Sequence, residues 1–308
     1  MTVAEQPLPA ARSPRTPWGP RVRAYVALTK PRIIELLLVT TIPTMFVAAR
    51  GVPSLWLMVA TTLGGTAAAG SANAMNCWFD RDIDAVMART AHRPLVTADV
   101  TPRNALRFGI VLGIVAFFWL ALTVNLLAAV LATAANLFYV LVYTMGLKRR
   151  TAQNIVIGGA AGCVPVLVGW AAVTGTVELP ALLLFAIVFA WTPPHFWALA
   201  LRSRRDYARA GVPMLPVVMG VRETARQILL YTVLLVALTL MFGAVAQLGL
   251  LYLVAALGLG AGYIASSVRL WRTPNAGTAQ SSFKYSITYM TLLFAAMAID
   301  AATLPLRG

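Results

Sequence analysis

Acidic residues and cysteines are scarce in this chain. Only 10 of the 308 residues are Asp or Glu, and charged residues of both signs make up 11%. The two cysteines, Cys77 and Cys163, form neither a disulfide framework nor a metal-binding spacing. The first 27 residues lack the apolar core of a cleavable signal peptide, and no later connection is long enough to hold a soluble domain. We therefore expect a disordered cytosolic tail over residues 1–27 and a single domain over residues 28–308.

Apolar residues make up 59% of the chain, and the mean hydropathy is +0.77. A membrane-spanning helix needs about 20 mostly apolar residues. The sequence contains about nine such runs, which predicts an all-α polytopic membrane protein. The runs lie near residues 33–49, 55–76, 104–122, 125–145, 154–174, 180–201, 226–246, 249–270 and 283–303.

The net charge of +15 follows from an excess of Lys and Arg in alternate loops. All of these residues except Arg50 and Arg307 fall in the N-terminal segment or in every second connection. Cytoplasmic loops collect Lys and Arg, so the distribution predicts a cytoplasmic N-terminus, an external C-terminus and an odd number of spans. It also explains the basic charge without a nucleic-acid partner.

Three of the ten acidic residues, Asp80, Asp82 and Asp84, are crowded together at the end of the second apolar run. Asn76, Asp80 and Asp84 recur every four residues, so on a helix they form one stripe, with Asp82 on the opposite face. Oxygen ligands of this kind suit Mg²⁺, which keeps waters and phosphate oxygens on its open side. An ordinary polar helix end explains one or two acids but not the stripe, because a carboxylate in a membrane segment costs about 2.5–3.5 kcal/mol.

Groups that suit a diphosphate lie near this stripe or in later loops on the same side. Arg89 and Arg93 follow it and can hold phosphate oxygens by bidentate hydrogen bonds. Tyr143 and Lys148 offer a hydroxyl and an ammonium group between the fourth and fifth runs. Each also has a simpler interpretation as a topology charge or an interfacial tyrosine. Asp206, after the sixth run, is a candidate further metal ligand.

Together these segments resemble the UbiA-type intramembrane prenyltransferases, and in particular the branch that farnesylates haem. Asn76, Asp80 and Asp84 match the Asn-x3-Asp-x3-Asp signature of that family. Many relatives carry two acids after the sixth helix, whereas here Arg202 takes the earlier position and only Asp206 remains. The segments that carry the resemblance are NCWFDRDID (76–84), RPLV (93–96), KRRTAQNIVIGG (148–159), TPPHFWALAL (192–201) and DYARAGVPMLPVV (206–218).

The resemblance implies a nine-helix bundle around a central cavity in the bacterial plasma membrane, with its active site facing the cytoplasm. The implied reaction joins the farnesyl group of farnesyl diphosphate to a haem B vinyl group, with addition of water. Mg²⁺ on Asn76, Asp80, Asp84 and Asp206 would neutralise the diphosphate, and Arg89, Arg93, Tyr143 and Lys148 would bind it. The implied partners are both substrates and the lipid bilayer, with haem A synthase or oxidase assembly proteins as further candidates.

The haem side rests on a single histidine. Pro193 and Pro194 predict a break in the sixth helix, because they lack backbone donors. His195, directly after them, would then either ligate haem iron or cap the broken helix.

Two other functions compete with this interpretation. One is prenyl transfer to an aromatic quinone precursor, which needs the same metal site. The other is cation-coupled transport, for which Glu35 and Asp300 are the acids inside predicted helices. Transporters place such charges near the bilayer midplane, whereas the Asp80 stripe lies at a helix end beside arginines, which favours an anionic diphosphate.

Overall fold

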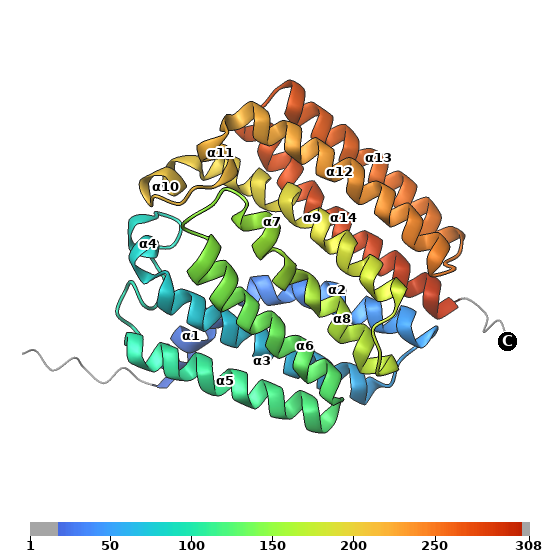
Figure 1. Ribbon diagram of the computed structural model, residues 1–308, viewed down its shortest axis with the longest axis horizontal. Coiled ribbons are helices and arrows are strands. Elements are labelled where there is room, and N and C mark those ends of the chain that lie inside the picture. The colour runs from blue at the N-terminus through green and yellow to red at the C-terminus, as the bar shows by residue number, and fades with distance from the viewer. Residues whose placement is uncertain (1–17, 304–308) are drawn as a thin grey trace, which may run out of the picture.

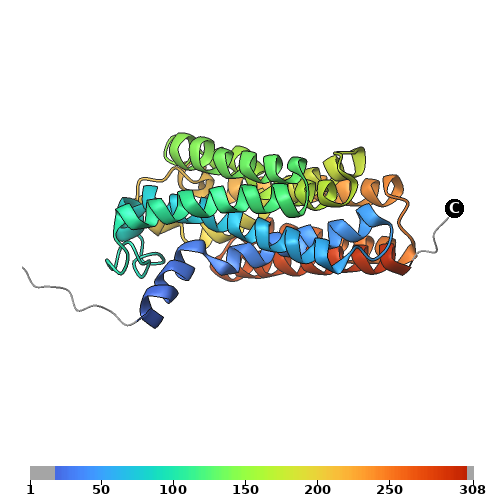
Figure 2. The same cartoon turned by 90° about the horizontal axis from the view of Figure 1, so that it is seen from below.

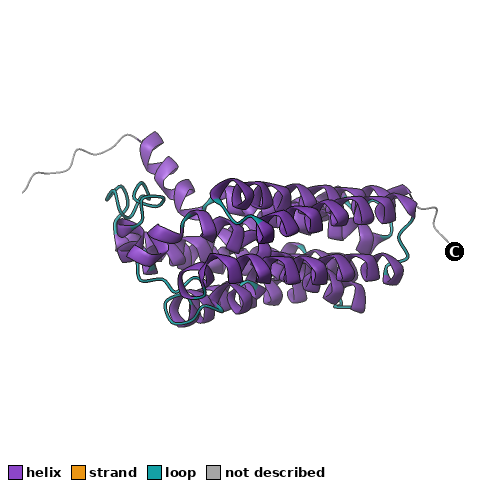
Figure 3. Cartoon of the chain, turned by 90° about the horizontal axis from the view of Figure 1, so that it is seen from above, coloured by secondary structure: helices purple, strands orange, loops and turns teal. Residues whose placement is uncertain are grey.

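The computed structural model describes residues 18–303, and within this range it contains helices and loops only (Figure 3). Long apolar segments without polar breaks satisfy their backbone hydrogen bonds within each helix, as a membrane requires. The helices are α1 (Trp18–Thr29), α2 (Pro31–Ala49), α3 (Leu55–Phe79), α4 (Arg81–Val86), α5 (Pro102–Thr123), α6 (Leu126–Leu137), the π-helix η1 (Phe138–Leu147), α7 (Asn154–Gly158), α8 (Ala160–Thr174), α9 (Leu179–Arg202), α10 (Arg204–Arg209), α11 (Leu215–Val218), α12 (Gly220–Val245), α13 (Leu250–Arg272) and α14 (Ala276–Thr303).

Every predicted span is present as a long helical segment. Eight segments in the described range are long and apolar enough to cross a membrane. Two of these segments join neighbouring elements, α6 with η1 and α7 with α8. The ninth prediction corresponds to α3, which is 25 residues long but rich in Gly, Ala, Ser and Thr. These small residues lower its hydropathy and let neighbouring helices approach closely.

The long helices lie side by side, and the short elements gather at one end (Figure 1). We call this the basic end and define it by α4, α10, α11 and the loop at residues 148–153, which carries Lys148, Arg149 and Arg150. The helix α1 leaves the bundle here at an angle (Figure 2), whereas α14 finishes at the opposite end. An odd number of crossings requires this arrangement. That the basic end faces the cytoplasm stays a prediction from the charge distribution.

The predicted break in the sixth long helix is wrong. The helix α9 continues through Pro193 and Pro194 to Arg202. It packs against α8, α12 and α14, and most of its residues from Trp191 to Ala200 are buried. Prolines are tolerated inside membrane helices where neighbours support the freed backbone groups, so packing outweighs the local preference for a break.

The predicted disorder of residues 1–27 is wrong for residues 18–27, which belong to α1; residues 1–17 lie outside the described range. Pro20 falls in the first turn of α1, where the missing N–H has no helical partner in any case. Ala24 and Leu28 are buried in a small core with Ala74 and Cys77 of α3. This contact stabilises α1 as a helix.

Candidate active site

The predicted stripe forms at the junction of α3 and α4. The backbone N–H of Asp80 donates to the carbonyl of Asn76 at 2.9 Å, and that of Asp84 donates to the carbonyl of Asp80 at 2.8 Å. The four-residue period therefore continues across the end of α3. All three side chains are buried, with exposed fractions of 2% for Asn76, 0% for Asp80 and 3% for Asp84. The structure thus places Asn76, Asp80 and Asp84 in one buried stripe.

Basic side chains from two separate loops reach this stripe. Lys148 donates to Oδ2 of Asp80, and Arg93 lies 2.5 Å from Oδ2 of Asp84. Arg149 lies 3.7 Å from Oδ1 of Asp80. Burial disfavours the ammonium form of Lys148, but Tyr143 and Asp80 outweigh this effect and leave its pKa raised.

Asp82 lies away from the stripe, as its place on the helix predicts. Its side chain is 61% exposed, and both of its oxygens accept hydrogen bonds from Arg149 at 2.6 Å. These hydrogen bonds hold the pKa of Asp82 at about 2. Arg149 therefore connects the exposed carboxylate to the buried one.

Lys30 is a site residue that sequence reasoning missed. Lys30 lies at the junction between α1 and α2. Its Nζ donates a hydrogen bond of 2.7 Å to Oδ1 of Asn76. The backbone of Lys30 is left-handed, with φ 54° and ψ 65°, a conformation that non-glycine residues adopt rarely and often at functional sites. Asn73 holds this junction by donating to the carbonyl of Thr29 at 2.9 Å. Burial lowers the pKa of Lys30 to about 8.

The π-helix η1 positions the residues that face the stripe from the other side. Its wider turn appears as a hydrogen bond from Lys148 N to the carbonyl of Tyr143, five residues earlier. Asn76 donates to the hydroxyl of Thr144 at 3.0 Å, which anchors η1 to α3. Tyr143 packs against Gly158, where a Cβ atom would come within 2.1 Å of its ring. Nothing in the sequence signals the π-helix, and Thr144 was missed with it.

Two of the residues predicted to bind the metal or the diphosphate are not gathered at the stripe. Arg89 is exposed, and Asp206 of α10 pairs with Arg209. Within residues 18–303, no three His, Cys, Asp or Glu side chains form a group that could hold a metal ion. The roles of Asp206 as a ligand and of Arg89 in diphosphate binding remain predictions.

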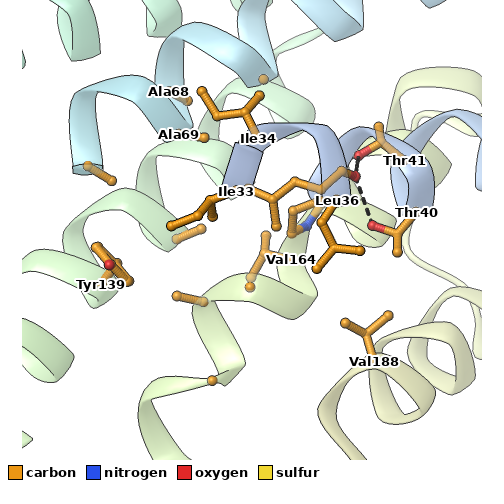
Figure 4. A pocket seen from close by; sticks show the side chains of 18 of the residues that line it. Ile33, Ile34, Leu36, Thr40, Thr41, Ala68, Ala69, Tyr139, Val164 and Val188 are labelled. Carbon is orange, nitrogen blue, oxygen red and sulfur yellow. Dashed lines mark hydrogen bonds between the residues drawn. The ribbon is translucent and has the colours of Figure 1, made fainter. Parts of the chain in front are cut away.

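An apolar cavity of about 240 Å³ opens beside the stripe (Figure 4). Asn73 and Tyr143 line it within one turn of Asn76 or Thr144, and Tyr139 lines it from the start of η1. Most other lining residues are Ala, Gly, Ile, Leu and Val from α2, α3, α6, α8 and α9. The arrangement joins a charged, buried polar cluster to a long apolar space, as an amphiphile with an anionic head would require.

His195 is not among the residues that line this cavity. It is 6% exposed, and its Nδ1 lies 2.7 Å from the hydroxyl of Ser286 on α14. The ring stacks on Trp191 at 4.3 Å between centroids and lies 4.8 Å from Phe283. These contacts join α9 to α14, and haem ligation by His195 stays a prediction.

The two acids that a transporter would need have other surroundings. Asp300 accepts hydrogen bonds from the backbone N–H groups of Gly249 and Tyr252 and so caps the start of α13. Glu35 is exposed on α2. Neither residue lines the cavity.

The stripe fits a divalent cation. Oδ1 of Asp80 is buried and accepts no hydrogen bond in the described part of the chain. The guanidinium group of Arg149 lies 3.7 Å away, beyond hydrogen-bond distance, so this oxygen can still contact a bound cation. Asn76, Asp80 and Asp84 supply the oxygen donors that Mg²⁺ prefers.

Comparison with known proteins identifies the family. Residues 37–295 match the model of the UbiA prenyltransferase family. The chain is 57% identical over 296 residues to protoheme IX farnesyltransferase 1 of Saccharopolyspora erythraea, covering 95% of this chain and 94% of that protein. It is also 57% identical to protoheme IX farnesyltransferase of Frankia alni over 284 residues, covering 91% and 98%.

Solved structures share the fold at lower identity. A digeranylgeranylglyceryl phosphate synthase structure superposes with a TM-score of 0.76 at 20% identity, covering 92% of this chain and 99% of that one. A UbiA homologue from Archaeoglobus fulgidus bound to DMAPP and Mg²⁺ superposes with a TM-score of 0.63 at 16% identity, covering 89% and 99%. The all-helical membrane fold is therefore that of the family.

Proposed function

The chain belongs to the UbiA prenyltransferase family, and we propose that it transfers the farnesyl group of farnesyl diphosphate to a vinyl group of haem B. The observation that carries this proposal is the buried Asn76–Asp80–Asp84 stripe, surrounded by cations and placed at one end of an apolar cavity. The names of relatives at 57% identity favour haem over a quinone precursor as the acceptor.

In this reaction the bond between C1 of the farnesyl group and the diphosphate oxygen breaks, and diphosphate leaves with the electron pair. The electron-rich vinyl group attacks C1, and a new carbon–carbon bond forms. Water then adds to the cation left on the haem side chain and releases a proton, which yields the hydroxyethylfarnesyl group of haem O. The protein supplies no nucleophile.

The cations around the stripe stabilise the leaving diphosphate. Four basic side chains contact the stripe or its neighbour Asp82, and together they would face the diphosphate: Lys30, Arg93, Lys148 and Arg149. Fixed positive groups in a site shielded from water stabilise the charge that develops as diphosphate departs. Arg89 and Tyr143 would add to this binding if the loop and η1 adjust around the substrate.

Asn76, Asp80 and Asp84 would hold Mg²⁺, with Asp206 as a further ligand if α10 moves closer. When bound, the ion neutralises diphosphate charge and so lowers the barrier to its departure. The homologue from Archaeoglobus fulgidus that binds DMAPP and Mg²⁺ supports a metal-dependent mechanism for this fold. The apolar cavity receives the prenyl chain and keeps water from the allylic cation until the vinyl group has reacted.

The site lies at the basic end of the bundle, which the charge distribution assigns to the cytoplasmic side of a bacterial plasma membrane. Water-soluble farnesyl diphosphate would therefore enter from the cytoplasm. The hydrophobic chain would pass directly into the membrane domain.

An acceptor comparison tests the proposal. Purified protein in lipid bilayers receives labelled farnesyl diphosphate and Mg²⁺ with either haem B or 4-hydroxybenzoate. We expect label in a haem product and none in the benzoate. Label in the benzoate alone would assign the chain to the quinone-precursor function instead.

A further inference from the structure

Two glycines that line the cavity are not required by close packing against a neighbouring helix. Gly65 of α3 and Gly162 of α8 both border it, and a Cβ atom added to either would meet no atom within 4 Å. Other glycines of these helices differ, because a Cβ at Gly64 would lie 2.4 Å from Leu120 and one at Gly169 would lie 2.7 Å from the carbonyl of Thr41. Gly64 and Gly169 are therefore explained by close helix packing, whereas Gly65 and Gly162 keep the cavity open.

Glycine inside a helix destabilises it relative to alanine, because the unfolded chain has more freedom to lose. A glycine at a helix position where a side chain would fit therefore lowers the stability of the helix and leaves the space beside it empty. At Gly65 and Gly162 that space belongs to the apolar cavity rather than to lipid, since both glycines are only partly exposed.

The part of the cavity away from the stripe is bordered by a close contact between two helices. Thr41, Thr61 and Val168 line its far part, and directly beyond them α2 and α8 touch at Gly169 and Thr41. Thr61 is fully buried, and its hydroxyl has no hydrogen-bond partner among the described residues. A buried hydroxyl without a partner is unfavourable, so a ligand group with π electrons, a weak acceptor, would complete this end.

The distance from Asn73 to Gly65 along α3 is close to the length of an extended farnesyl chain. Eight residues separate Asn73, at the level of the stripe, from Gly65, which corresponds to about 12 Å along α3. A farnesyl chain of about eleven successive carbon–carbon bonds spans roughly 13 Å at the roughly 1.2 Å per bond of an extended chain. A geranyl chain of about seven bonds spans roughly 8 Å on the same basis and would stop short of Gly65.

We propose that Gly65 is a specificity-determining residue that admits the last isoprene unit of the farnesyl chain. Gly162 makes room for an earlier isoprene unit, nearer the diphosphate, because it lies one helical turn beyond Gly158, which packs against Tyr143. The chain extends between α3 and α8, and its terminal double bond lies near Thr61. This inference rests on the proposed function, because it assumes that the cavity binds the prenyl group.

The test adds a side chain at each depth and varies the length of the donor. Gly65→Leu and Gly162→Leu are assayed for prenyl transfer to haem B from dimethylallyl, geranyl and farnesyl diphosphates, and for Mg²⁺-dependent binding of each donor. Gly258→Leu is the matched control, because Gly258 lies in a helix, has no atom near its Cβ position and is exposed outside the cavity. Gly65→Ala serves as a milder variant that keeps the fold.

We expect Gly65→Leu to lower farnesyl transfer and binding about ten-fold or more and to change geranyl binding less than about two-fold. Gly162→Leu should weaken geranyl binding as well, and Gly258→Leu should change neither. Gly65→Ala should shift the preference in the same direction by a smaller factor. Equal loss for all three donors, or unchanged farnesyl binding in Gly65→Leu, would overturn the inference. A wild-type protein that transfers no prenyl group to haem would instead refute the proposed function.

Discussion

Replacing Asp80 by Asn removes one buried negative charge and preserves the shape of the side chain. Asp80 is fully buried and pairs with Lys148, so the change leaves that ammonium without its partner. Breaking a buried ion pair from one side costs about 3–5 kcal/mol of folding stability. We expect the lower part of this range, about 3 kcal/mol, because Lys148 retains some exposure and can turn toward water.

The catalytic effect should be larger than the effect on stability. Loss of one preorganised electrostatic group typically lowers kcat by about 10²–10³-fold. The sharper readout is the dependence of diphosphate binding on Mg²⁺. Without Mg²⁺, Asp80→Asn should bind farnesyl diphosphate at least as well as the wild type, because one repelling charge is gone. With Mg²⁺, the wild type should gain affinity and the variant should gain little.

Asp82→Asn is the matched control, since it makes the same substitution two residues away on the exposed face. An exposed ion pair contributes about 0–1 kcal/mol, so stability and transfer should change little. Isothermal titration in detergent, with and without Mg²⁺, measures both variants. The reasoning is refuted if Asp82→Asn loses as much activity as Asp80→Asn, or if Mg²⁺ strengthens diphosphate binding equally in both.

Three further predictions address other parts of the site and the fold. Lys30→Met should lower affinity for farnesyl diphosphate about ten-fold, measured by titration, and leave haem binding unchanged; equal affinity would remove Lys30 from the site. His195→Ala should lower the melting temperature and leave the Soret band of bound haem in place, whereas a shifted band would identify an iron ligand. Cysteines at positions 150 and 177 should be labelled from opposite sides of the membrane, the first from the cytoplasm, and labelling from one side would overturn the topology.

The long helices were predictable because apolar length is a strong local signal. The predicted run at residues 125–145, for example, corresponds to the segment Leu126–Leu147. The Asn76–Asp80–Asp84 stripe was also predictable from local sequence, because it depends only on the helical period. Local reasoning was misleading at Pro193 and Pro194, where burial of α9 among three helices maintains the helix.

Other features depend on contacts between distant segments. Lys30 is indistinguishable in the sequence from the other basic residues of the N-terminal segment. Its role depends on a left-handed backbone and on a hydrogen bond from Asn73 to Thr29, 44 residues away. The contact that anchors the π-helix likewise joins distant residues, since Asn76 and Thr144 are 68 positions apart. The pairing of Asp206 with Arg209 also had no signal in the sequence, because basic residues surround Asp206 on both sides.

The most direct test of the central claim is the mass of the haem product. Purified protein in lipid bilayers is given haem B, isotopically labelled farnesyl diphosphate and Mg²⁺ in ¹⁸O-labelled water. The account predicts a haem that has gained one labelled farnesyl group and one ¹⁸O atom, with release of diphosphate and no product when EDTA is present. Unmodified haem under these conditions, or a farnesylated product that forms equally well in EDTA, would contradict it.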